Sequence, residues 1–240
     1  MAHIDLNSDV GEGFGAWAGG PDELLVPLLT SVNVACGFHA GDPSTMRRTC
    51  ELALAHDCVI GAQVSYPDLV GFGRRFMEMH PDDLRDAVLY QLGALDGIVG
   101  ALDGGVSYVK PHGALYNAIV RHEVQAQAVV TAVMEYDPTM PVLGLPGSAV
   151  EAACQRAGLT FVREGFADRA YTAEGTLVPR TQPGALLTEP DQAAEQALRL
   201  AESGVQSLCV HSDTPGAPDL LVAVVEALGA AGWEPRPFVS

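Results

Sequence analysis

Lysine is almost absent from this chain of 240 residues, because its 13 basic side chains comprise a single lysine, Lys110, and otherwise only arginines. A Walker-type phosphate-binding loop requires Gly-Lys-Ser/Thr, whereas this lysine lies in Val-Lys-Pro, so the chain contains no such loop. A lysine kept where arginine is used elsewhere is a candidate for a site that needs a compact ammonium group. Retention by chance is the alternative.

Basic charge, long apolar runs and paired cysteines are also lacking. The formal net charge of −17 would repel phosphate backbones and anionic lipid surfaces, so neither nucleic acid nor a membrane is expected as a partner. No stretch of about 18 residues is both apolar and uncharged, and the first residues show no secretory pattern. The five cysteines form no Cys-x-x-Cys motif, so neither a disulfide framework nor a zinc knuckle is indicated. We expect a soluble protein of the reducing cytoplasm.

Seven short, mostly apolar runs alternate with seven helical patterns. The runs have the length of buried strands, and several helical patterns open at proline or serine with acids in the first turn, as helix N-termini do. The predicted strands are residues 4–7, 31–35, 58–64, 106–110, 142–145, 160–164 and 207–211. The predicted helices are residues 21–30, 43–56, 81–102, 122–135, 148–157, 190–203 and 218–231.

This alternation predicts an α/β fold with a parallel sheet covered by helices, because each crossover must return the chain to the same end of the sheet. We expect one domain over residues 1–240, since 48% apolar residues can fill a core and no linker-like segment interrupts the chain. A closed or nearly closed seven-stranded (β/α) barrel is favoured, because polar residues follow nearly every predicted strand. The alternative is an open doubly wound sheet, which would gather them at one crevice.

Groups of polar residues lie at the carboxyl ends of six predicted strands. In chain order they are Asn7, Asp9 and Glu12; Cys36, His39 and Asp42; Gln63, Ser65, Tyr66 and Asp68; Lys110, His112 and Tyr116; Glu164, Asp168, Arg169 and Tyr171; and His211, Ser212 and Asp213. Any one group has an ordinary explanation, such as helix capping. Six groups on one rim are harder to explain that way, because clustered ionisable side chains cost stability unless they bind something.

The first polar loop, residues 11–16, formally matches the Gly-x-Gly-x-x-Gly/Ala dinucleotide fingerprint. We reject that interpretation, because Asp9 and Glu12 would face a pyrophosphate with like charge and the next strand ends without an acid to hold a ribose. The two acids are instead paired carboxylates, one of which could act as general acid or base, or else solvated loop residues.

A metal and a nucleophile are further alternatives at the rim. Ligand types suited to Zn²⁺ or Mn²⁺ are present in His39, His112, His211, Asp9 and Asp213. No short-range ligand motif supports such a site, so the sequence leaves the metal open. A nucleophilic Cys36 near His39, or Ser212 beside His211, is weaker still, because adjacent strand residues point to opposite faces.

Five sequence blocks resemble the LamB/YcsF family, in the family's order and across nearly the whole chain. They are residues 4–13 (IDLNSDVGEG), 33–42 (NVACGFHAGD), 109–117 (VKPHGALYN), 166–171 (FADRAY) and 177–180 (LVPR). The resemblance implies a variant (β/α) barrel related to glycoside hydrolases and polysaccharide deacetylases. It also implies the activity of the family's characterised member, a subunit that works with B and C subunits in the ATP-dependent opening of 5-oxoproline to L-glutamate. ATP would then be bound by the partner subunits.

The polar groups at the strand ends, taken together with the resemblance, lead us to assign site roles. As catalytic residues we expect Asp9, Glu12, His39, Lys110 and His112. As substrate-binding residues we expect Asn7, Asp42, Tyr66, Asp168, Arg169, Tyr171, Arg180, His211 and Asp213. In this hypothesis a partner phosphorylates the lactam, Asp9 or Glu12 directs water, and Lys110 with a histidine stabilises the developing oxyanion.

The chain departs from the family pattern in three places. Gln63 stands where the family usually has histidine, which weakens the case for a divalent metal, and Ser212 stands where glycine is usual. Residues 190–207 are also shorter than in many relatives. Two other functions therefore stay open: a stand-alone metal-dependent deacetylase or amidohydrolase acting on a carbohydrate or small lactam, and a binding subunit without catalysis.

Overall fold

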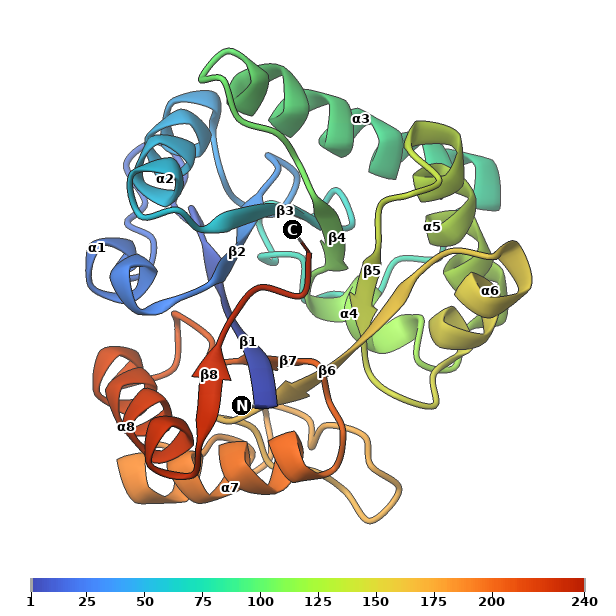
Figure 1. Cartoon of the computed structure of the whole chain (residues 1–240). Coiled ribbons are helices and arrows are strands. Elements are labelled where there is room, and N and C mark those ends of the chain that lie inside the picture. Colours follow the sequence, from blue (N-terminus) through green and yellow to red (C-terminus); the bar gives the residue numbers. More distant parts are fainter. Residues whose placement is uncertain (1, 240) are drawn as a thin grey trace.

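Seven parallel strands close into a barrel in the computed structural model, which describes residues 2–239 (Figure 1). The strands are β1 (Ala2–Val10), β2 (Ser31–Ala35), β3 (Val59–Val64), β4 (Tyr108–Pro111), β5 (Val142–Gly144), β6 (Phe161–Phe166) and β7 (Ser207–Cys209). They follow one another around the barrel, and β1 pairs with both β7 and β2 to close it. The predicted barrel is confirmed, and the open doubly wound sheet is excluded by the β1–β2 pairing.

Helices surround the barrel on its outside (Figure 1). They are α1 (Asp22–Leu25), the 3-10 helix η1 (Val26–Leu28), α2 (Pro43–Ala55), α3 (Pro81–Gly100), α4 (Gly113–Ala118), α5 (Glu123–Tyr136), α6 (Ala149–Ala157), α7 (Pro190–Glu202) and α8 (Ala217–Ala230). The helix predicted over residues 21–30 is split into α1 and η1, because Pro27 lacks the N–H that would continue the α-helix. Within residues 2–239 none of these helices combines the length and the apolar character that a bilayer crossing requires.

Two elements were not predicted. The six residues of α4 follow β4 directly and contain a glycine and an asparagine, so they read as a loop. The short strand β8 (Trp233–Pro235) pairs in parallel with Ala2–Ile4 at the start of β1. Just beyond it, the ring of Phe238 contacts that of Tyr108 with centroids 5.0 Å apart, so the C-terminal segment covers this end of the barrel.

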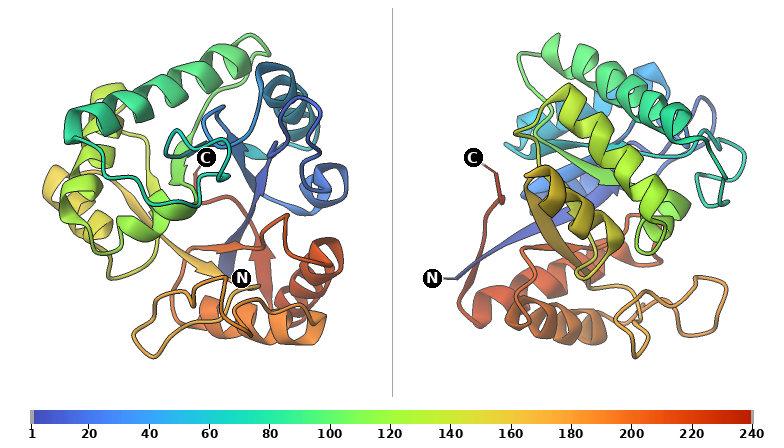
Figure 2. Two further views of the ribbon diagram at one scale, coloured as in Figure 1. Left: turned by 180° about the vertical axis from the view of Figure 1, so that it is seen from behind. Right: turned by 90° about the vertical axis from the view of Figure 1, so that its right-hand side faces the viewer.

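The loops that follow the strands gather at the opposite end. In the right-hand view of Figure 2 both termini lie on one side, and the loops after β3 and β6 project on the other. Alternate residues of β1 point into the barrel: Asp5 accepts from Ser31 and Asn7 donates to Glu164, both across strand boundaries. The third inward position of β1 is Asp9, and it lies at the loop end. The barrel interior is therefore polar along its axis.

Gly61 of β3 makes room for the buried ring of Tyr108, whose hydroxyl donates to Oδ1 of Asn33 at 2.8 Å. A Cβ atom on Gly61 would overlap the ring carbons, and the hydrogen bond prevents the ring from moving aside. We expect Gly61→Ala to lower the free energy of unfolding by about 1–3 kcal/mol through overpacking. The control Gly93→Ala, on the exposed face of α3 with open space around it, should instead stabilise the protein by about 0.5–1 kcal/mol. Urea denaturation measures the free energy of unfolding of both variants. Equal values would show that the Tyr108 ring does not need the space at Gly61.

Candidate functional site

A cavity of about 830 Å³ opens at the loop end of the barrel. Its inner wall carries titratable side chains from β1, β4 and the segments that follow β4 and β7, namely Asp9, Lys110, His112 and His211. Its outer wall carries three arginines from the loops after β3 and β6, namely Arg74, Arg169 and Arg180. The rim predicted from the sequence is thus a concave site with two chemically different halves.

Lys110 lies almost completely buried in the barrel. Its Nζ atom is 2.8 Å from Oε1 of Glu164, 3.1 Å from Oδ1 of Asp9 and 3.1 Å from Oδ1 of Asn7, and Sγ of Cys209 lies at 3.1 Å. Burial alone would lower the pKa of Lys110, but the neighbouring carboxylates, Asp9 first among them, raise it well above its ordinary value. The side chain is therefore an ammonium ion whose protons are already directed at these neighbours, so it holds the two carboxylates in place.

Asp9 presents a charged carboxylate to the cavity. Its Oδ1 atom accepts from both Lys110 and Asn33, the latter at 3.0 Å. Burial alone would raise the pKa of Asp9, but Lys110, followed by His211 and His112, holds it well below its usual range. So acidic a carboxylate is a weak proton acceptor, yet it remains charged and can orient a water molecule or a substrate N–H.

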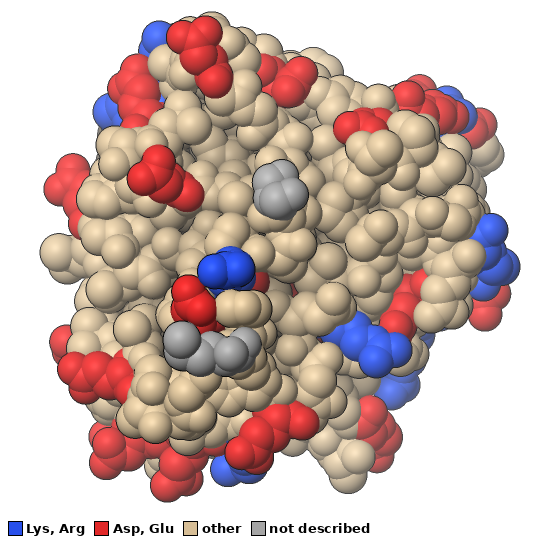
Figure 3. All heavy atoms as spheres, in the orientation of Figure 1, with Lys and Arg blue, Asp and Glu red and all other residues tan. Residues whose placement is uncertain are grey.

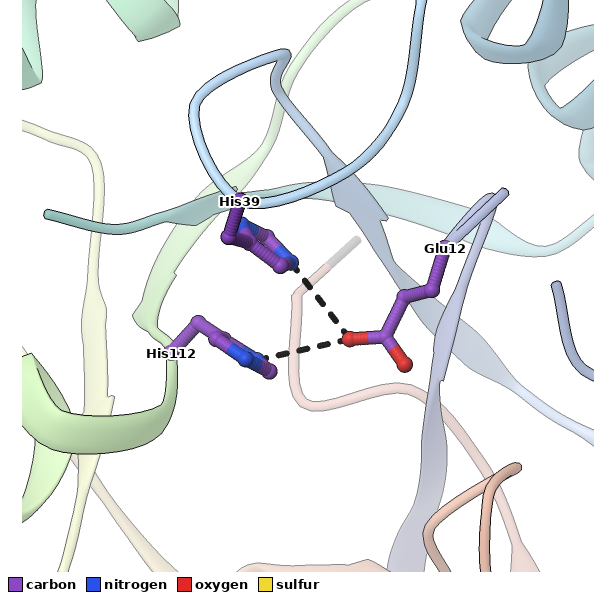
Figure 4. Close-up of side chains that lie close together, drawn as sticks. All are labelled: Glu12, His39 and His112. Atoms are coloured by element: carbon purple, nitrogen blue, oxygen red, sulfur yellow. Dashed lines mark ion pairs between the residues drawn. The ribbon is translucent and has the colours of Figure 1, made fainter. Parts of the chain in front are cut away.

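Glu12, His39 and His112 form a compact cluster beside Asp9 (Figure 4). The two imidazole rings stack with centroids 3.9 Å apart. Oε1 of Glu12 is 3.4 Å from Nε2 of His39 and 3.4 Å from Nδ1 of His112. The amide of Gln63 contacts all three side chains. Its Nε2 atom is 2.9 Å from Oε1 of Glu12 and 2.9 Å from Nδ1 of His112, and its Oε1 atom is 3.1 Å from Nε2 of His39.

These hydrogen bonds determine where the protons lie. The carbonyl oxygen of Phe72, 3.0 Å from Nε2 of His112, can only accept, so Nε2 donates and Nδ1 is the acceptor for the Gln63 amide. Burial, followed by His39, lowers the pKa of His112 well below its ordinary value, in agreement with a neutral ring. The Gln63 carbonyl oxygen then faces His39, whose Nε2 must donate. Nδ1 of His39 is left buried without a partner among the described residues.

The ligand atoms of Glu12, His39 and His112 lie within 4.8 Å of one another, close enough to coordinate one metal ion. The hydrogen bond from His112 to Phe72 is also the kind that orients a metal-bound histidine. However, Gln63 directs N–H groups at two of these atoms, and an N–H group repels a cation. The residues as arranged fit the amide of Gln63 and not a metal ion.

His211 and Asp168 form a hydrogen-bonded pair at the inner wall. Nδ1 of His211 is 3.0 Å from each carboxylate oxygen of Asp168, which also accepts from the hydroxyl of Thr214. Burial alone would raise the pKa of Asp168, but His211 and these hydrogen bonds lower it, so the carboxylate is charged. A proton on Nδ1 leaves Nε2 as the acceptor of a ring that lines the cavity. This is the arrangement of a general base oriented by a second group.

Most of the other predicted site residues lie behind the cavity wall and do not line it. Asn7, Glu12, His39, Asp168 and Asp213 do not line the cavity but contact residues that do. Asp42 caps α2, and Tyr66 donates to Gln125 and lies edge-on to the ring of Phe76, which lines the cavity. Tyr171 accepts from the backbone N–H of Phe166 and supports the wall from behind.

Arg74, which lies ten residues beyond β3, was not predicted as a site residue. Its only signal in the sequence is an Arg-Arg pair in an acidic chain, and the same pair occurs at residues 47–48 on α2. Its place at the cavity follows from the path of the loop that the left-hand view of Figure 2 shows crossing the end of the barrel.

The amide of Gln63 leads to a prediction about metal binding. We expect Gln63→His to bind Zn²⁺ roughly tenfold more tightly than the parent or better, because an imidazole replaces the N–H groups that face Glu12 and His112. Isothermal titration calorimetry with zinc alone measures the difference. The double variant Gln63→His/His39→Gln should lose the gain, and an equally tight parent protein would show that Gln63 does not exclude the ion.

Comparison with known proteins places the chain in a family. Residues 4–240 match the LamB/YcsF family. The chain is 51% identical to the A subunit of 5-oxoprolinase from Kocuria rhizophila, with 99% of this chain and 100% of that protein covered, and 54% identical to its counterpart from Streptomyces avermitilis, with 98% and 99% covered.

Solved structures agree with this placement. The lactam utilization protein from Thermus thermophilus superposes with a TM-score of 0.93 at 42% identity, covering 98% of this chain and 100% of that one. The catalytic domain of a peptidoglycan N-acetylglucosamine deacetylase from Eubacterium rectale gives a TM-score of 0.57 at 11% identity, with 99% and 88% covered, which shows a shared fold only. The chain is a member of the LamB/YcsF family.

Proposed function

We propose that this chain is the A subunit of an ATP-dependent 5-oxoprolinase, which opens the lactam of 5-oxo-L-proline to L-glutamate together with B and C subunits. The names and full-length coverage of its relatives support this proposal. The observation that carries the chemistry is that His211, hydrogen-bonded to Asp168, lines the same cavity as the carboxylate of Asp9. His211 can accept a proton there, and Asp9 can orient the water molecule that donates it.

An unstrained lactam resists hydrolysis, so ATP has to activate it. In the proposed sequence a partner subunit transfers the γ-phosphoryl group of ATP to the lactam oxygen, and ADP leaves. Water then adds to the ring carbon, and its proton passes to Nε2 of His211. That proton is returned to the ring nitrogen as the carbon–nitrogen bond breaks, which leaves an amine and an acyl phosphate. A second water molecule then hydrolyses the acyl phosphate, which releases inorganic phosphate and gives L-glutamate.

Asp9, Lys110 and Tyr116 have separate tasks in this proposal. Oδ1 of Asp9 is held by Lys110, which leaves its other oxygen to accept a hydrogen bond from water or from the ring N–H. Tyr116 lines the cavity, and its hydroxyl is buried without a hydrogen-bond partner in the described part of the chain. Burial raises the pKa of Tyr116 well above its ordinary value, so it remains a donor that can contact the lactam.

The same proposal covers partners and location. ATP is bound by the B and C subunits, while the present chain, acting as one domain over residues 1–240, supplies the lactam site. The cytoplasm suits the five cysteines, all buried and free in the described structure. A stand-alone metal-dependent deacetylase is disfavoured by the position of Gln63 among the would-be ligands.

The pair of His211 and Asp168 is tested in the reconstituted complex. We expect His211→Gln to reduce kcat for ATP-dependent glutamate formation by roughly 10²–10⁴-fold, and Asp168→Asn to reduce it too, with KM changing less. The control His56→Gln alters an exposed histidine at the end of α2 and should be fully active. Wild-type turnover by His211→Gln would show that His211 is not the catalytic base.

Lys110 gives a second test in the same assay. Lys110→Arg keeps the positive charge but replaces a point-like donor with a planar fork where four groups already lie within 3.1 Å. We expect kcat/KM to fall roughly tenfold or more, because Asp9 is displaced from the cavity wall. Urea denaturation of the same variant checks that it is folded. An unchanged kcat/KM would show that the ammonium group of Lys110 has no role in the site.

A further inference from the structure

Three arginines converge on the outer half of the cavity, in a chain whose net charge is −17. Arg74 and Arg180 both contact Asp213: a terminal nitrogen of Arg74 lies 2.5 Å from Oδ2, and one of Arg180 lies 3.3 Å from Oδ1. Arg169 pairs with no carboxylate in the described structure. It donates instead to the backbone carbonyls of Val178, at 2.7 Å, and Ala185, at 3.3 Å.

The burial of Arg169 makes this arrangement costly. The residue is only 5% exposed, and a guanidinium that is desolvated without a counter-ion destabilises a protein. Burial, followed by the like charge of Arg180, lowers the pKa of Arg169 to about 10. The carboxylate of Asp168 opposes this shift, but its oxygens are already occupied by His211 and Thr214. The guanidinium therefore lies in the cavity wall with unmet charge.

The remaining charged groups of the cavity do not compensate for the arginines. Arg121 and Glu174 also line it and carry opposite charges that cancel each other. Deep inside, the two carboxylates of Asp9 and Glu164 exceed the charge of Lys110, so this part of the cavity adds no positive charge. On the face with the chain termini, acidic side chains are more frequent than basic ones (Figure 3).

We propose that Arg74, Arg169 and Arg180 form an oxyanion subsite that holds the negatively charged end of the substrate. The proposal rests on the proposed function, because it places the anionic end outward and the lactam beside Asp9 and His211. The three guanidinium groups exceed the combined charge of Asp213 and Asp168 by one, which matches a carboxylate or a phosphoryl group. Asp213 holds Arg74 and Arg180 at the mouth before the anion arrives.

Calorimetry on the isolated chain tests the subsite with inorganic phosphate, 5-oxo-L-proline and the neutral lactam 2-pyrrolidone. We expect Arg180→Gln and Arg74→Gln each to weaken the binding of both anions by roughly tenfold or more, and to leave the binding of 2-pyrrolidone unchanged. Both side chains are partly exposed, so folding should survive, and circular dichroism checks it. The control Arg47→Gln removes an exposed arginine of α2 and should bind all three like the parent.

Competition distinguishes the source of the anion. If phosphate displaces 5-oxo-L-proline, the subsite holds the substrate's carboxylate; if the two bind together, it holds a phosphoryl group. Either result supports the subsite. The subsite proposal is overturned if neither anion binds the parent protein or if the Arg74 and Arg180 variants bind the anions as the parent does. It is also overturned if Arg47→Gln weakens anion binding to the same extent. Arginine-dependent binding in a chain that supports no glutamate formation in the complex would refute the proposed function alone.

Discussion

The ammonium ion of Lys110 is the interaction on which the interior of this barrel depends. Asp9 and Glu164 are both buried, and an isolated carboxylate there would cost several kcal/mol or take up a proton. Lys110 lies between them, 3.1 Å from one and 2.8 Å from the other. A guanidinium would need a wider, planar space, which gives a physical reason for a lysine at this position. Because Lys110 keeps Asp9 ionised, the electrostatics of the cavity begin inside the barrel.

The barrel supports this polar axis from its closed end. Tyr108, Leu143 and Val162 form an apolar layer, and Phe238 from the C-terminal segment packs on it. Water is thereby kept from the side of the barrel opposite the cavity, so the hydrogen bonds of Asn7 and Lys110 form in a low-dielectric interior where they are stronger. The short strand β8 contributes no residue to the site, yet it anchors the segment that closes the floor.

How much of this was predictable depends on the range of the interactions. The barrel follows from local periodicity, and the shared rim follows from the rule that parallel strands end together. Arg74 was missed because its place depends on the path of a long loop. The effect of Gln63 was anticipated as a lost ligand, but not as an amide that fixes the protons of His39 and His112. Proton positions depend on partners from several strands, which local sequence patterns do not specify.

The two halves of the cavity differ in how closely their basic groups are paired with carboxylates, and that difference indicates what must come from outside. In the inner half, Lys110 and Gln63 use their hydrogen-bonding capacity on protein neighbours, so this part is preorganised before any ligand arrives. In the outer half, Arg169 is buried against carbonyl oxygens alone. A bound anion would remove that deficit, so the stability lost by burying the arginine becomes binding energy at the site where the substrate must be held.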